Sequence, residues 1–152
     1  MQIADVMTPG PITCTPETTV AEAAHLMWEG DCGVLPVVSG HTLHGVVTDR
    51  DLFIALATRD AKPSQLTVGA VARTNPVTCS PRDDVRQAMG KMKAKRVRRL
   101  PVVDSDGTLV GMVSMNDLVL AVSPESSLGG KVVDTLQTIS EHLLPVPVAK
   151  HG

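Results

Sequence analysis

The sequence predicts an α+β fold, which some schemes class as α/β, made of two β-α-β-β-α units and a C-terminal helix. The first observation behind this prediction is an internal repeat in the 152-residue chain. Shifted by 65 positions, residues 3–38 lie over residues 68–103 with many identities. The second observation is that hydrophobic periodicity changes from strand-like to helix-like in the same order within each copy. A unit that occurs only twice indicates two halves of one module, because a solenoid needs at least three.

The segment that closes each unit is the clearest part of the repeat. Gly45 to Leu52 reads G-V-V-T-D-R-D-L, and Gly111 to Leu118 reads G-M-V-S-M-N-D-L. Each begins with a short apolar run that suits a buried strand, and then places Thr or Ser three residues before Asp. A strand that runs into a helix in this way points backbone N–H groups and the positive end of the helix dipole at one spot. We therefore expect two related anion sites.

Each unit is expected to begin with a short extended segment followed by a helix. Ile12 to Cys14 and Val77 to Cys79 are the extended segments, because each lies between prolines. Apolar residues with helical spacing begin at Val20 and at Val85. The helix starts carry the spacing of capping boxes, in Thr19 with Glu22 and in Asp84 with Gln87.

Two strands and a second helix complete each unit. The expected strands are Leu35 to Val38, Leu43 to Thr48, Leu100 to Val103 and Leu109 to Ser114, joined in pairs by turns rich in Gly, Ser and Asp. The second helices are expected from about Arg50 and from about Asn116.

The repeat divides the chain into four segments. These are a first unit over 1–58, a polar linker over 59–67, a second unit over 68–123 and a tail over 124–152. The apolar residues of the tail that share one helical face are Val132, Val133, Leu136, Ile139, Leu143 and Leu144, and Pro145 and Pro147 end the pattern. We expect this amphipathic helix to pack on its own domain or on a sister chain. A foreign partner or a membrane is less favoured, and the membrane least of all because Lys131 is the only cation of the helix.

Composition indicates a globular protein, with 43% hydrophobic and 20% charged residues. One Trp, one Phe and no Tyr argue against a stacking platform for single-stranded nucleic acid. The first residues lack the regions of a signal peptide, and no apolar run approaches the roughly 20 residues of a membrane helix. The three cysteines lack C-x-x-C spacing, which fits reduced thiols, so we expect a cytoplasmic protein.

The order of these motifs resembles the tandem CBS domain, named after cystathionine β-synthase and also called a Bateman module. The resemblance covers about residues 3–122. It rests on V-M-T-P at Val6 to Pro9, on two L-P-V-V strands and on G-x-V-[ST]-x-x-D-L in both halves. It implies two CBS repeats related by a pseudo-two-fold axis, with two clefts between them. In this family the clefts commonly bind AMP, ADP, ATP, NAD or S-adenosylmethionine, and members often pair into disc-like homodimers.

The resemblance also implies roles for individual residues of a nucleotide site. The implied ribose contacts are Asp51 and Asp117. The residues implied at or beside phosphate are Thr48, Arg50, Arg98, Arg99, Ser114 and Asn116. The residues implied around adenine are Thr13, Pro36, Val37, Thr78, Pro101 and Val102. Arg98 and Arg99 match a basic pair that reaches phosphate in the nucleotide-sensing subunit of AMP-activated kinase.

Charge also distinguishes the halves. Residues 1–65 carry a net charge of −5 and residues 66–152 a net charge of +3, and Gly33 and Val34 stand where the second half has Arg98 and Arg99. We expect the arginine pair to contact a polyphosphate. Lys91, Lys93 and Lys95 are expected to be solvated at a helix end.

Other candidate residues have simpler interpretations. A capping box alone would explain either Ser/Thr-x-x-Asp motif, although capping and ligand contact are compatible. Cys14 and Cys79 have the pattern of small buried residues rather than redox or metal groups. His41 and His44 are too few for a zinc site, so we expect a surface turn unless a homodimer brings two pairs together.

The sequence shows no nucleophile motif with His and acid partners, no Walker loop and no metal triad, so we expect no enzyme and no required cofactor. The expected function is a regulatory module that binds an adenosine-containing ligand and signals to an unidentified protein by a conformational or dimer change. One alternative is a ligand-free dimerisation or assembly protein. A weaker one is nucleic-acid binding through Lys91 to Arg99, because the net charge is −2 and no reading motif accompanies the cluster.

Overall fold

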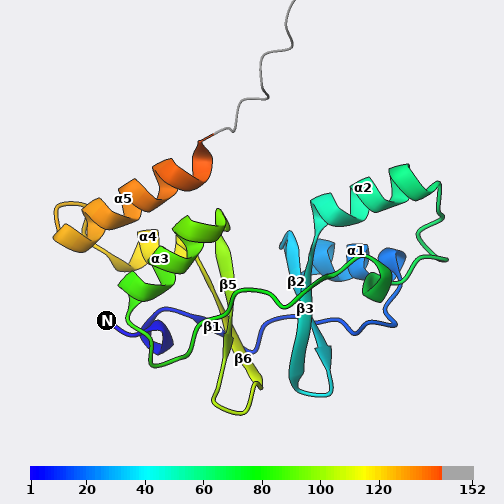
Figure 1. Cartoon of the computed structure of the whole chain (residues 1–152), viewed down its shortest axis with the longest axis horizontal. Helices are drawn as coiled ribbons and strands as arrows, with labels where there is room; N and C mark the ends of the chain where they lie inside the picture. Colours follow the sequence, from blue (N-terminus) through cyan, green and yellow to red (C-terminus); the bar gives the residue numbers. More distant parts are fainter. Residues whose placement is uncertain (142–152) are drawn as a thin grey trace, which may run out of the picture.

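The computed structural model describes residues 1–141. It contains two similar halves side by side, each with a three-stranded sheet and two helices (Figure 1). The elements of the first half are α1 (Val20–Glu29), β2 (Val34–Ser39), β3 (Thr42–Thr48) and α2 (Asp49–Arg59). Those of the second half are α3 (Val85–Lys95), β5 (Arg99–Val103), β6 (Leu109–Ser114) and α4 (Met115–Ala121). The predicted α+β class is confirmed.

The helix starts follow the capping signals of the sequence. Capping boxes join Thr19 to Glu22 at α1 and Asp84 to Gln87 at α3. The extended segments predicted at Ile12 to Cys14 and Val77 to Cys79 are shorter than predicted. Cys14 and Cys79 each form only one isolated parallel bridge. The flanking prolines explain this, since proline has no N–H to donate to a ladder.

The two halves exchange their opening segments, which the sequence did not reveal. Strand β1 (Thr8–Pro9) pairs with β6 of the second half, whereas β4 (Arg73–Thr74) pairs with β3 of the first half. Short 3₁₀ helices precede these strands at Ile3–Asp5 and Val68–Ala70. Ile3 is buried in the core of the second half, and its equivalent Val68 is buried in the core of the first. Each core is therefore completed by a segment from the other side.

Glycine at the start of the repeated motif makes room for this exchange. A Cβ at Gly45 would lie 2.5 Å from the carbonyl oxygen of Arg73. A Cβ at Gly111 would lie 3.0 Å from the carbonyl oxygen of Thr8. Any larger residue would push the added strand away, which explains why Gly recurs in both copies.

The contacts between halves are reciprocal, as a pseudo-two-fold axis requires. The bridge between Gln2 and Asp84 is matched by one between Thr67 and Thr19, and both join equivalent pairs of residues. A third bridge joins Thr42 to its own equivalent, Thr108, where the two hairpins meet near the axis.

The tail begins with α5 (Ser127–Ser140), which packs on α3 and α4 of its own half (Figure 1). Val132 is buried there, and Leu128, Leu136 and Ile139 pack against the same core. One of the two expected placements of the helix, on its own domain, is thus observed. Leu143, Leu144, Pro145 and Pro147 lie outside the described residues.

Candidate functional site

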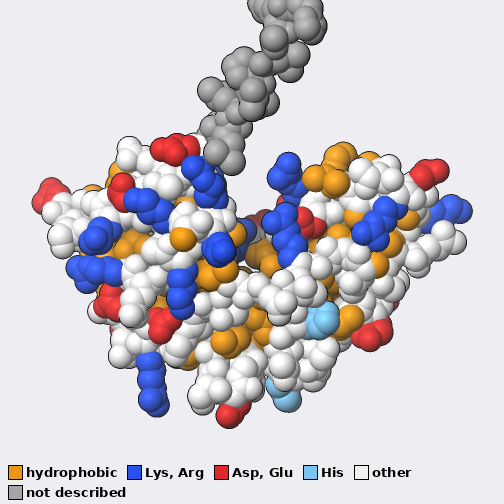
Figure 2. Space-filling view, in the orientation of Figure 1, with side chains coloured by type: hydrophobic (Ala, Val, Ile, Leu, Met, Phe, Trp, Pro, Cys, Tyr) orange, Lys and Arg blue, Asp and Glu red, His pale blue; other side chains and the backbone are white. Residues whose placement is uncertain are grey.

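A cleft of about 910 Å³ lies between the two halves. Figure 2 shows it as a hollow at the centre of the molecule, with Lys and Arg side chains gathered around it. The first half contributes the end of β3 and the start of α2, and the second half contributes the end of α3 and the start of β5. Residues 73–77, which lead into the second half, complete the lining.

The cleft is strongly cationic. Among residues 1–141, the positively charged residues that line it are Arg50, Arg73, Lys95, Arg96, Arg98 and Arg99, and the only lining carboxylate is that of Asp49. All of these side chains belong to exposed residues, so they meet the solvent in the cleft. Such an arrangement raises the local concentration of anions and favours a ligand with several negative charges.

The backbone N–H groups at the start of α2 already have partners. The N–H of Asp49 donates to the carbonyl oxygen of Gly33 at 3.0 Å. The N–H of Arg50 donates to Oδ1 of Asp49 at 2.8 Å, and that of Asp51 donates to Oγ1 of Thr48 at 3.1 Å. The expected anion spot at this helix start is therefore occupied by the protein's own carboxylate, and the positive charge of the cleft comes from side chains.

Asp51 combines capping with an ion pair to Arg73, which lines the cleft, although Asp51 is not itself a lining residue. Its Oδ2 accepts a hydrogen bond from the N–H of Thr48, and its Oδ1 lies 2.9 Å from Nη2 of Arg73. The Asp51 side chain is only 11% exposed, whereas that of Arg73 is 67% exposed. A ribose that approached this carboxylate would have to displace Arg73.

The equivalent carboxylate of the second half lies elsewhere. Oδ2 of Asp117 accepts hydrogen bonds from the N–H and the hydroxyl of Ser114, at 2.7 and 2.8 Å. Neither residue, nor Asn116, lines the central cleft or the second cavity described below. These three sequence-predicted site residues thus lie together at the start of α4 but apart from both cavities.

The remaining predicted site residues divide between the cleft, a second cavity and the core. Those that line the central cleft are Thr48, Arg50, Arg98, Arg99 and Pro101. Thr78 lines the second cavity, whereas Pro36, Val37 and Val102 are buried in strands and Thr13 is partly buried. Carbonyl oxygens of the two strand prolines already accept hydrogen bonds from the N–H groups of Cys14 and Cys79, at 3.0 and 3.1 Å.

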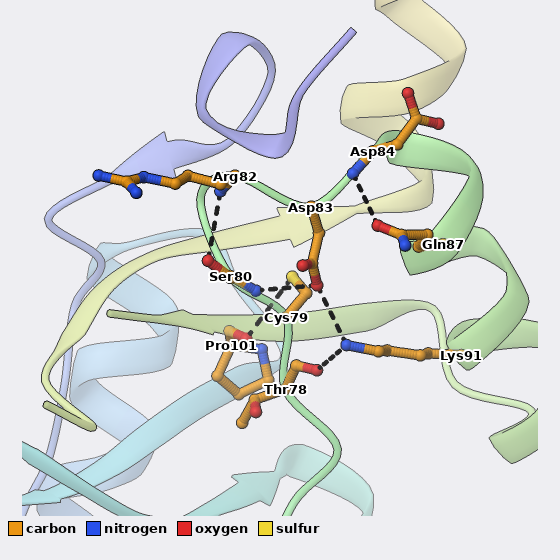
Figure 3. A network of polar contacts seen from close by, with 9 residues as sticks. All are labelled: Thr78, Cys79, Ser80, Arg82, Asp83, Asp84, Gln87, Lys91 and Pro101. Atoms are coloured by element: carbon orange, nitrogen blue, oxygen red, sulfur yellow. Dashed lines mark hydrogen bonds and ion pairs between the residues drawn. The ribbon is translucent and has the colours of Figure 1, made fainter. Parts of the chain in front are cut away.

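The second cavity, of about 640 Å³, lies beside the start of α3 and contains an internal ion pair. Nζ of Lys91 lies 3.1 Å from Oδ2 of Asp83 and donates to the carbonyl oxygen of Thr78 at 3.0 Å (Figure 3). A hydrogen bond from the N–H of Ser80, followed by the ion pair with Lys91, holds the pKa of Asp83 below its ordinary value. Lys91 is therefore a structural cation and not part of the central cleft.

The lysines of the basic cluster have separate roles. Nζ of Lys93 lies 2.7 Å from Oδ2 of Asp134 on α5, and Lys95 lines the central cleft. Lys95 and Arg96 were not predicted as cleft residues, although both belong to the basic cluster of Lys91 to Arg99. Arg73 and Asp49 were not predicted either, because their positions depend on the strand exchange and on the entry into α2.

The cysteines and histidines do not form a reactive centre in residues 1–141. Burial raises the pKa of the Cys14 and Cys79 thiols to about 11, so both are protonated at neutral pH. No cluster of three or more His, Cys, Asp or Glu side chains suited to a metal ion occurs within this range. His41 and His44 are exposed on the hairpin.

Residues 1–141 include no helix that is long and apolar enough to cross a bilayer.

The sequence of each half matches the model of the CBS domain, over residues 3–58 and 68–124. The chain belongs to the CBS-domain family. The CBS domain-containing protein YhcV of Bacillus subtilis is 33% identical to it over 132 residues, which is 87% of this chain and 93% of YhcV. The resemblance to the tandem CBS domain, drawn from the repeated motifs, is thus confirmed.

Two solved CBS structures with bound ligands share the fold. CBSX2 in complex with AMP superposes with a TM-score of 0.69 at 30% identity, covering 79% of this chain and 94% of that one. The CBS-domain pair of MJ0100, in complex with 5′-methylthioadenosine and S-adenosyl-L-methionine, gives a TM-score of 0.71 at 26% identity. The match covers 79% of this chain and 98% of that pair.

Proposed function

We propose that the protein is a regulatory module that binds an adenosine nucleotide with several phosphates, ATP or ADP, in the central cleft, without turning it over. The observation that carries the proposal is that the described part of the chain places six Lys and Arg side chains and one carboxylate around the cleft. CBS relatives with similar folds that bind AMP or S-adenosylmethionine support the adenosine part of the ligand. The bound ligand would change the relative arrangement of the halves, and a regulated partner or a homodimer would respond.

Charge decides among the adenosine ligands. S-adenosylmethionine carries a cationic sulfonium, which the arginines of this cleft would repel, whereas each added phosphate increases the attraction. Arg50 and Arg99 have no hydrogen bond or ion pair to another side chain within residues 1–141, so both are available to phosphate oxygens. Arg98 would join them. Guanidinium groups suit this task because they donate paired hydrogen bonds to phosphate.

The polar and apolar parts of the cleft suggest an orientation. Val34, Val77 and Pro101 line the part of the cleft near β2 and β5, which suits the adenine face. Asp51 would accept from the ribose hydroxyls once Arg73 turns to the phosphates. The ligand would then contact both halves at once, which gives it a differential affinity for one arrangement of the halves.

Thermal unfolding of nucleotide-stripped protein with AMP, ADP, ATP, NAD or S-adenosylmethionine tests the proposal. A ligand at about 100 times its dissociation constant should add roughly 2.7 kcal/mol of stability. We expect the stabilisation to fall in the order ATP, ADP, AMP, and to decrease with added salt. Stabilisation by S-adenosylmethionine alone would contradict the charge argument. No stabilisation by any of the five would favour the ligand-free assembly protein.

A further inference from the structure

The C-terminal turn of α5, together with the residue that follows it, lies against the central cleft. Ile139 lines the cleft, and the hydroxyl of Ser140 accepts a hydrogen bond from Nη2 of Arg98 at 3.3 Å. Nη1 of Arg96 donates to the carbonyl oxygens of Thr138 and Glu141, at 3.0 and 3.1 Å. Nη2 of Arg96 lies 3.3 Å from the carboxylate of Glu141. Two of the six cleft cations are therefore engaged by the end of the tail helix.

Arg96 acts as a cap for α5. The last carbonyl groups of a helix have no partners within it, and Arg96 supplies donors to two carbonyls at this end. The backbone φ angle of Arg96 is positive, at 52°, and that of its equivalent in the first half, Asp31, is also positive, at 46°. The fold thus uses this backbone conformation in both halves, but only in the second half does the residue carry a side chain that reaches a fifth helix.

We propose that residues 138–141 form a latch that competes with the phosphate groups of a bound nucleotide for Arg96 and Arg98. This proposal rests on the proposed function and adds a mode of regulation to it. A guanidinium forms stronger hydrogen bonds with a charged phosphate than with a neutral hydroxyl or carbonyl. The one charged partner in the latch, the carboxylate of Glu141, is 66% exposed, and ion pairs at such exposed positions contribute little. A phosphate in the cleft therefore draws both arginines from the latch, and the end of α5 loses its cap.

The rest of α5 stays in place when the latch opens. Val132 remains buried against the second-half core, and the ion pair between Lys93 and Asp134 lies outside the cleft lining. Opening is thus confined to the last turn, and ligand occupancy is converted into exposure of a helix end. Because binding couplings are reciprocal, whatever holds the latch closed weakens nucleotide binding, and whatever opens it strengthens binding.

Ser140→Ala tests the competition without a change of charge. The substitution removes the hydroxyl that accepts a hydrogen bond from Arg98 and leaves the body of the helix intact. ATP should therefore bind about two- to fivefold more tightly, which is the range that the loss of one modest hydrogen bond allows. Ser127→Ala, at the other end of α5 and away from the cleft, is the matched control and should leave the affinity unchanged. An affinity of Ser140→Ala for ATP that is unchanged or weaker overturns the latch, because Ser140 would then be neutral or would position Arg98 for the ligand.

Hydrogen exchange provides the second readout. The N–H of Glu141 donates to the carbonyl oxygen of Gln137 at 3.0 Å and reports on the last turn of the helix. Saturating ATP should speed the exchange of this amide while exchange around Val132 stays slow. Equal or slower exchange at Glu141 with ATP bound overturns the proposal and leaves the nucleotide function standing.

Failure of the proposed function gives a different pattern. If neither ATP nor ADP binds, the nucleotide function is wrong, and inorganic pyrophosphate replaces ATP as the probe of the latch. Faster exchange at Glu141 with pyrophosphate then supports competition for the arginines, and unchanged exchange overturns it.

Discussion

The two halves of the molecule have the same framework but different cleft and surface residues. Equivalent core positions are filled alike, as in Leu35 and Leu100 or Leu52 and Leu118, and all four are buried. Where the first half presents Gly33 and Val34 to the cleft, the second presents Arg98 and Arg99. The difference indicates that a duplicated fold is preserved through its core while one copy supplies most of the charge for an anion.

A second difference concerns the loop before the first helix of each half. In the first half, the N–H of Thr15 donates to the hydroxyl of Thr18 at 3.0 Å. At the equivalent place in the second half, Ser80 donates to the carboxylate of Asp83, which also pairs with Lys91. The same turn is thus stabilised by neutral groups in one half and by an ion pair in the other.

The outer helices differ most. Trp28 on α1 and Phe53 on α2 are 80% and 73% exposed. The position equivalent to Trp28 is Lys93, which pairs with Asp134 of α5. The helix that covers the second half therefore has no counterpart on the first among the described residues, and only the second half can transmit a change at the cleft to a tail helix.

The largest predicted effect tests the exchange of opening segments. Ile3→Ala should lower the free energy of unfolding by about 2–4 kcal/mol, because Ile3 is fully buried in the second-half core. Urea denaturation measures the loss, and we expect one transition because the exchanged segments join the halves. Val68→Ala, its equivalent in the other core, should also destabilise, by less, since fewer atoms are removed. A cost below about 0.5 kcal/mol for Ile3→Ala, typical of surface positions, would contradict the exchange.

An intermediate effect distinguishes the two repeated aspartates. Asp51→Ala and Asp117→Ala should each cost about 1 kcal/mol of stability, because each removes half of a capping box. Only Asp51→Ala should weaken ATP binding, by about tenfold if a charge-assisted bond to ribose is lost. Neither aspartate lines a cavity itself, but Asp51 pairs with Arg73 of the cleft wall, whereas Asp117 bonds to Ser114, which lines neither cavity. Asp117→Ala should therefore leave the affinity unchanged. Calorimetry of both variants makes the comparison, and the opposite order would place the nucleotide at the second-half motif.

The smallest predicted effect is a pH dependence confined to the second half. Because the pKa of folded Asp83 is lowered, its contribution to stability is full above the ordinary value of 3.8 and is lost as the pH falls through the lower folded-state pKa. Asp83→Asn should therefore be less stable than the wild type at pH 7, and the difference in stability should vanish in acid. We expect a difference of under about 1 kcal/mol, because the ion pair between Asp83 and Lys91 is partly exposed to solvent. Thr18→Ala, at the equivalent position, should give a difference that does not depend on pH. A constant difference for Asp83→Asn would mean that its charge contributes nothing.

Much of the fold could be predicted from the sequence because repeats, capping boxes and periodicity are local signals. Thr19, Thr48, Asp84 and Ser114 all cap the helices that their motifs indicated. The exchange of β1 and β4 depends on which glycine each strand approaches, a contact between residues distant in the sequence. The cleft was harder to predict for the same reason, since Arg73 reaches it through that exchange and Asp49 replaces the expected external anion at α2.

The nucleotide site in the central cleft is tested most directly by a calorimetric titration of nucleotide-stripped protein with ATP, for the wild type, Arg99→Ala and Arg86→Ala. Arg99 lines the cleft, whereas Arg86 lies on α3 outside both cavities and offers a control with the same loss of charge. We expect ATP binding that Arg99→Ala weakens about tenfold, equivalent to about 1.4 kcal/mol, and that Arg86→Ala leaves unchanged. Absence of ATP binding, or equal affinities of the wild type and Arg99→Ala for ATP, would rule out a nucleotide site at Arg99 in the central cleft.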